Sequence, residues 1–92
     1  MSDYANEFDK KIRKKKKQAM KYFKDNFSNK EKRAKREICR EILNQIQICE
    51  ELLRPVGETQ IKDWFECVSV EQLLRKARTH KFEYQRAKRN AS

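Results

Sequence analysis

The sequence predicts a small all-α protein, a helical bundle of three longer helices and one short helix. Apolar residues recur every three to four positions along most of the chain, which is the period of an amphipathic helix. The 92 residues include a single Gly and a single Pro, so the chain has few of the residues that shape tight turns between β-strands. This length corresponds to one small domain, and we expect residues 1–92 to form it.

The first helix is expected from residue 3 or 4 to Asn26. Acidic residues near its start suit the positive end of the helix dipole. Its apolar face is interrupted at Lys15 and Lys16, where the helical period requires another apolar residue. Because the four lysines of positions 14–17 circle a helix completely, we expect them to project into solvent or onto an anion. The apolar face consists of Phe8, Ile12, Ala19, Phe23 and Phe27.

The second helix is predicted to begin at Asn29 and to end near Leu53. Ser28 and Glu31 match the S-x-x-E capping box that starts many helices. The helical periodicity that follows is the strongest in the chain, so this helix should be the central hydrophobic element. Its apolar positions are Ala34, Ile38, Cys39, Ile42, Leu43, Ile46, Cys49, Leu52 and Leu53.

A break follows at positions 54–57, where Pro55 disfavours a helical residue before it and Gly57 permits a turn. A short helix is expected from about Gln60 to Cys67. Ile61, Trp64, Phe65 and Val68 lie on one side of it, and Trp64 and Phe65 are interpreted as core anchors.

The last helix is predicted to start at Val70, because Ser69 and Gln72 match a second capping box. Apolar residues become sparse after Thr79 while basic residues accumulate. We therefore expect the basic tail from about residue 85 to fray in the free protein.

Charge is distributed in three blocks along the chain, whose formal net charge is +10. Residues 10–40 contain 15 Lys or Arg against three acids, residues 41–71 contain two against seven, and residues 72–92 contain seven against one. This basic, acidic, basic order indicates one surface devoted to an anionic partner.

The Lys10–Lys17 run, KKIRKKKK, is the sharpest motif, because no acid occurs from Lys10 to Lys24. Lysines on flexible stems neutralise backbone phosphates and release counterions, which gives affinity without sequence readout. Basic residues after Ser28 and in the last helix would extend the same surface. The candidate nucleic-acid-binding residues are Lys10, Lys11, Arg13, Lys14, Lys15, Lys16, Lys17, Arg33, Arg36, Arg75, Arg78 and Lys81.

These features predict a non-enzymatic nucleic-acid-binding protein, with DNA or RNA as partner, acting mainly through phosphate contacts. The alternative is a small regulator or inhibitor that docks on an acidic surface of a larger protein. The acidic middle segment and the apolar surplus of the second helix favour this alternative, and the surplus also leaves a homodimer open. Attachment to an anionic membrane surface ranks last, because lysines interrupt the apolar face of the first helix.

Catalysis and metal binding find little support in the sequence. The chain has a single His, no Gly-rich phosphate loop, and three cysteines without C-x-x-C spacing. Cys39, Cys49 and Cys67 are expected to be free thiols in a reducing compartment. We therefore expect a cytoplasmic protein without cofactors, nuclear if the source is eukaryotic.

Overall fold

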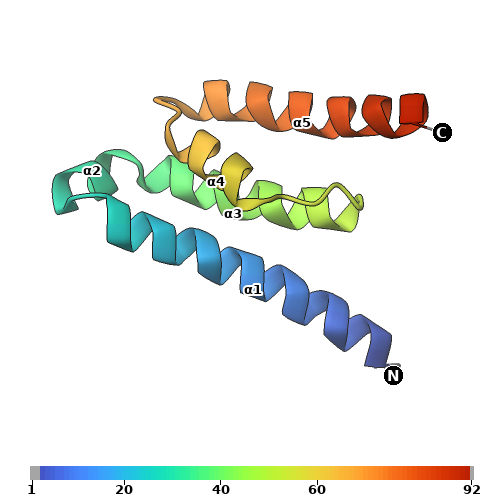
Figure 1. Cartoon of the computed structure of the whole chain (residues 1–92). Coiled ribbons are helices and arrows are strands. Elements are labelled where there is room, and N and C mark those ends of the chain that lie inside the picture. The colour runs from blue at the N-terminus through green and yellow to red at the C-terminus, as the bar shows by residue number, and fades with distance from the viewer. Residues whose placement is uncertain (1–2, 92) are drawn as a thin grey trace.

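The part of the chain that the structure describes folds into helices and connecting segments, as the computed structural model shows (Figure 1). The structure describes the backbone of residues 3–91 and the side chains of residues 7–82. Over this part of the chain no strand occurs, and the predicted small all-α bundle is confirmed. The helices are α1 (Asp3–Asn26), α2 (Asn29–Ala34), α3 (Arg36–Glu51), α4 (Glu58–Phe65) and α5 (Val70–Ala91).

Helix α3 lies in the middle of the bundle and packs against all the other helices. In Figure 1, α1 runs antiparallel to α3 on one side, and α5 runs parallel to α3 on the other side. The Cα atoms extend over 44 × 34 × 17 Å, so the molecule is flat, with α1 and α5 at opposite edges. The two basic segments therefore do not adjoin, although the sequence allowed them to share one side.

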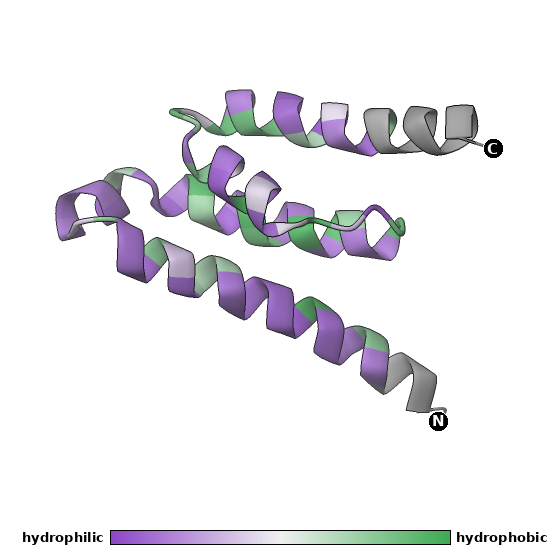
Figure 2. Ribbon diagram, in the orientation of Figure 1, coloured by the Kyte–Doolittle hydropathy of each residue, from purple (hydrophilic) through white to green (hydrophobic). Residues whose placement is uncertain are grey.

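The core is centred on α3, as the periodicity predicts. Ile42, Ile46 and Cys49 have no exposed surface, and the two predicted core anchors, Trp64 and Phe65, are 1% and 0% exposed. Both α3 and α4 contain green segments in Figure 2, and the two helices pack against each other. The apolar stripe of the second predicted helix ends earlier than expected, because α3 stops at Glu51. Leu52 and Leu53 lie beyond it and are exposed.

The second predicted helix is two helices, because the chain bends at Lys35. The backbone of Lys35 has φ −102° and ψ 13°, and neither Gly nor Pro marks this position. The Lys35 ammonium donates to the backbone carbonyl of Phe65 and, at 3.3 Å, to that of Cys67, and it lies 5.2 Å from the ring centre of Phe27. A cation at the C-terminal end of α4 satisfies carbonyls that the helix leaves unpaired. This tertiary contact accompanies the bend.

Helix caps account for the remaining boundaries. The Ser28–Glu31 capping box is present, and its hydrogen bonds lower the pKa of Glu31. Helix α4 begins two residues earlier than predicted, because the Gln60 side chain accepts from the Gly57 N–H at 3.0 Å. Gly57 has φ −89°, so it supplies space for this side chain rather than a left-handed turn.

The start of α5 at Val70 is confirmed, with the Gln72 N–H donating to Ser69 Oγ at 3.1 Å. Val68, expected on the same side of the short helix as Trp64 and Phe65, is 85% exposed because it lies in the connection between α4 and α5. The tail expected to fray from residue 85 belongs to α5 as far as Ala91, and its side chains lie outside the described residues.

A Schellman motif ends α3, with a leucine at the position that glycine usually holds. The Leu53 N–H donates to Glu50 O at 3.1 Å, and the Arg54 N–H donates to Cys49 O at 2.7 Å. Leu53 has φ 57°, in the left-handed region, and its side chain is 70% exposed. A side chain at this φ costs about 1–2 kcal/mol, and little burial offsets the cost here.

We expect Leu53→Gly to stabilise the protein. Glycine removes the left-handed strain but loses about 0.5–1 kcal/mol through unfolded-state entropy, so the net gain should be about 0.5–1 kcal/mol. Urea denaturation measures this difference. Leu52→Gly is the matched control, because Leu52 is also exposed but has φ −85°, and we expect it to destabilise. A Leu53→Gly protein no more stable than the wild type would contradict the assignment of strain.

Candidate nucleic-acid interface

The outer face of α1 is a continuous row of lysines. At about 100° per residue, five lysines spaced three or four positions apart fall within an arc of about 80° on the side opposite the buried face. All five side chains are exposed. We call this row the lysine stripe; it consists of Lys10, Lys14, Lys17, Lys21 and Lys24.

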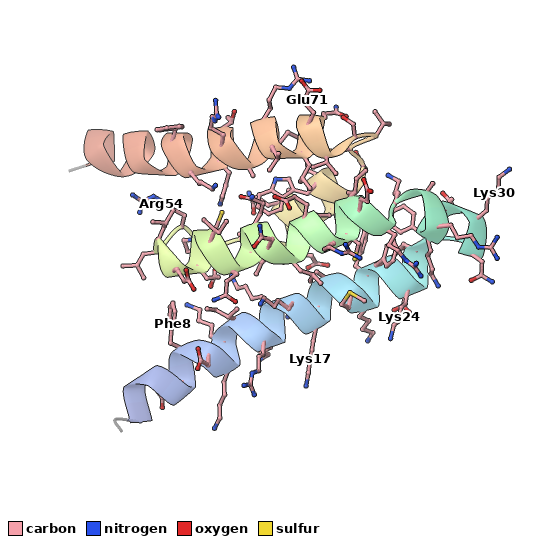
Figure 3. The ribbon with its side chains drawn as sticks, turned by 180° about the vertical axis from the view of Figure 1, so that it is seen from behind. Phe8, Lys17, Lys24, Lys30, Arg54 and Glu71 are labelled. Atoms are coloured by element: carbon pink, nitrogen blue, oxygen red, sulfur yellow. The ribbon has the colours of Figure 1, made fainter. Side chains whose placement is uncertain are left out.

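The lysine stripe faces away from the rest of the bundle. Figure 3 shows Lys17 and Lys24 pointing from α1 to the side opposite α3, and Figure 2 shows most of α1 in the hydrophilic colour. Among the described side chains, none forms an ion pair with a member of the stripe. No described carboxylate therefore competes with an external anion for these ammonium groups. Arg13 and Lys11, on the flanks of the stripe, are exposed as well.

Lys15 and Lys16 turn inward instead. Lys15 Nζ donates to the Val56 carbonyl at 2.8 Å and lies 3.5 Å from Glu50 Oε2, and its side chain is only 21% exposed. Lys16 Nζ donates to Gln47 Oε1 at 2.7 Å. Lys15 occupies the gap in the apolar stripe of α1, where its methylene stem covers apolar surface while its charge meets a carboxylate. Of the four consecutive lysines, two are structural and two, Lys14 and Lys17, face solvent.

A basic hollow lies where α1, α2 and the start of α3 meet. It is an open cavity of about 570 Å³. Its charged side chains are all cationic, and among the described residues they make no ion pair or hydrogen bond within the protein. Met20 and Phe23 supply an apolar part, and Asn29 supplies an uncharged amide. The four cations are Lys24, Lys32, Arg33 and Arg36.

The predicted residues of α5 lie at the opposite edge of the molecule. Arg75 and Arg78 are exposed and Lys81 is half-buried. Acidic residues are close to this region: Lys76 Nζ lies 2.8 Å from Asp63 Oδ1, and this hydrogen bond raises the pKa of Lys76. The structure thus separates the predicted site into a set on α1, α2 and α3 and a set on α5.

Lys21, Lys24 and Lys32 complete the first set, although sequence reasoning did not select them. For Lys21 and Lys24 the signal was present, because they continue the spacing of Lys10, Lys14 and Lys17 by three or four residues. Lys32 joins them only through the hairpin between α1 and α2, which no local pattern defines.

The three cysteine thiols and the His80 imidazole contribute to the packing of the protein. Burial raises the pKa of the thiols of Cys39, Cys49 and Cys67, which disfavours the nucleophilic thiolate. The His80 Nε2 atom lies 3.0 Å from the Pro55 carbonyl, with its ring edge-on to Trp64. Within the described residues, no group of three or more His, Cys, Asp or Glu side chains could hold a metal ion. None of the described helices is long and apolar enough to cross a membrane.

Comparisons with known protein families, with curated proteins and with solved structures find no match to this chain.

Proposed function

We propose that the protein is a non-enzymatic nucleic-acid-binding protein that contacts backbone phosphates through α1. The observation that carries this proposal is the lysine stripe, five exposed cations on one helix face with no intramolecular counter-ion among the described residues. Phosphate contacts by such lysines give affinity that depends on salt and little on sequence.

The dimensions of the stripe suit a polyanion better than a small anion. From Lys10 to Lys24 the helix rises about 21 Å, at 1.5 Å per residue. Measured along the axis of a duplex, this distance equals the rise of roughly six base pairs, at 3.4 Å each. A single small anion would reach only one or two of the five ammonium groups. The charge is therefore distributed along a line, as a nucleic-acid backbone is.

A salt titration tests this function. We expect fluorescence anisotropy with labelled duplex DNA, single-stranded DNA and structured RNA to show micromolar or tighter binding to at least one of them at low salt. Three to five phosphate contacts predict that the logarithm of the association constant falls with the logarithm of the salt concentration with a slope of about −2 to −4.5. Absence of binding at low salt, or binding that high salt leaves unchanged, would refute the proposal.

The rival function, a regulator that docks on another protein, draws on a different part of the molecule. Beyond the end of α3 lies an open cavity of about 360 Å³, in which the apolar side chains of Phe8, Leu53 and Pro55 adjoin the charged side chains of Glu7, Lys11 and Glu50. Exposed apolar side chains in such a place are typical of protein contacts when they form one patch. Sedimentation at two protein concentrations tests the homodimer directly. A mass that doubles with concentration would show that a second copy covers this patch, whereas a monomer that binds no nucleic acid would favour the rival.

A further inference from the structure

We infer that the basic hollow binds an unpaired nucleotide, so that the protein prefers single-stranded over duplex nucleic acid. This inference rests on the proposed function and names the form of nucleic acid that the protein selects. The phosphate would lie among Lys24, Lys32, Arg33 and Arg36, and the base would contact Met20 and Phe23.

The hollow continues the lysine stripe, since Lys24 belongs to both. A strand that follows the stripe along α1 therefore arrives at the corner between α1 and α2. Arg33 belongs to α2 and Arg36 to α3. The hollow therefore has cations from these two helices as well as Lys24 from α1. Guanidinium groups hold phosphates with several donors in a fixed geometry, and their planes also stack on bases.

The hollow also has apolar and uncharged polar lining residues, which a site for phosphate alone would not need. Met20 is half-buried and Phe23 is 9% exposed, so each presents a small apolar surface to the cavity. The ring of Phe23 is stacked on the ring of Phe65, with the two ring centres 5.6 Å apart, so Phe23 is held by packing within the core. The Asn29 amide has both a donor and an acceptor and forms no hydrogen bond within the described residues, so it can pair with the edge of a base.

Duplex nucleic acid fits this geometry poorly, because its bases are stacked and paired and cannot offer a free base to a recess between helices. Unpaired bases can leave the stack and enter such a recess. The volume of about 570 Å³ falls within the range of about 300–1,000 Å³ that is typical of small-ligand cavities.

Anisotropy with three labelled probes tests the inference: a single strand of about twelve nucleotides, its duplex, and an abasic strand that keeps the phosphates but lacks the bases. We expect the wild-type protein to bind the single strand about fivefold or more tightly than either other probe. Arg33→Gln/Arg36→Gln should remove most of this preference. Lys30→Gln/Arg40→Gln is the matched control, because it removes the same charge from exposed residues of α2 and α3 that do not line the hollow.

The outcomes separate the two proposals. If the single strand is preferred and only the Arg33/Arg36 variant loses that preference, the inference stands. If all three probes bind alike, or if both double variants lose affinity equally, the hollow is not a nucleotide site while the proposed function remains. If no probe binds even at low salt, both proposals fall. Circular dichroism of each variant checks that the helices are retained.

Discussion

Glu50→Ala is expected to lower the free energy of unfolding by about 2–3 kcal/mol. Glu50 is 4% exposed and accepts from the Val56 N–H at 3.0 Å, while Lys15 Nζ lies 3.5 Å from the same carboxylate oxygen. Alanine leaves the buried Val56 N–H without a partner, which costs about 1–3 kcal/mol, and it removes the counter-ion of Lys15. Lys15 keeps the Val56 carbonyl and some contact with water, so the ammonium group adds only a modest further cost.

Glu51→Ala is the matched control for this prediction. The neighbouring carboxylate is exposed and interacts only with the Gln47 amide along the same helix face, among the described side chains. We expect its loss to change stability by less than about 0.5 kcal/mol. Glu50→Gln should fall between the two, since its amide oxygen still accepts from Val56. Urea denaturation of the three variants would contradict the role of Glu50 if Glu50→Ala and Glu51→Ala had equal effects.

This contact also explains what sequence reasoning could and could not predict about α1. The apolar stripe from Phe8 to Phe23 has its gap at Lys15, so the helical period already places this residue on the buried face. The expectation that the lysines of positions 14–17 project into solvent or onto an anionic partner does not extend to Lys15, whose ammonium group turns inward to Glu50. That pairing joins residues 35 positions apart, and only the packing of α1 on α3 brings them together.

The bend at Lys35 has a similar origin. Capping and periodicity predicted the start of α2 and the buried face of α3 correctly, because both are local properties of a helix. The interruption between them has no local signal, since Lys35 is an ordinary helix former. Its ammonium binds carbonyls at the end of α4, and the basic hollow lies on the same bend. The candidate site could therefore be predicted in its residue types but not in its shape.

Lys14→Gln/Lys17→Gln is expected to weaken nucleic-acid binding by roughly 25- to 60-fold at about 0.1 M salt. Each phosphate contact contributes about 0.7–0.9 to the slope of log affinity against log salt, so two lost contacts remove about 1.4–1.8 logarithmic units at this concentration. The slope itself should become shallower by about the same amount. Both lysines are exposed and make no described contact within the protein, so stability should be unchanged.

Arg75→Gln/Arg78→Gln distinguishes a defined interface from attraction to net charge. These two exposed arginines lie on α5, at the opposite edge of the molecule, and their replacement removes the same charge. If α1 is the interface, this variant should lose less than about threefold in affinity, with the salt slope retained, because no phosphate contact is removed. Equal losses in the two variants would mean that affinity follows the total charge of +10 and that the lysine stripe is not a distinct site.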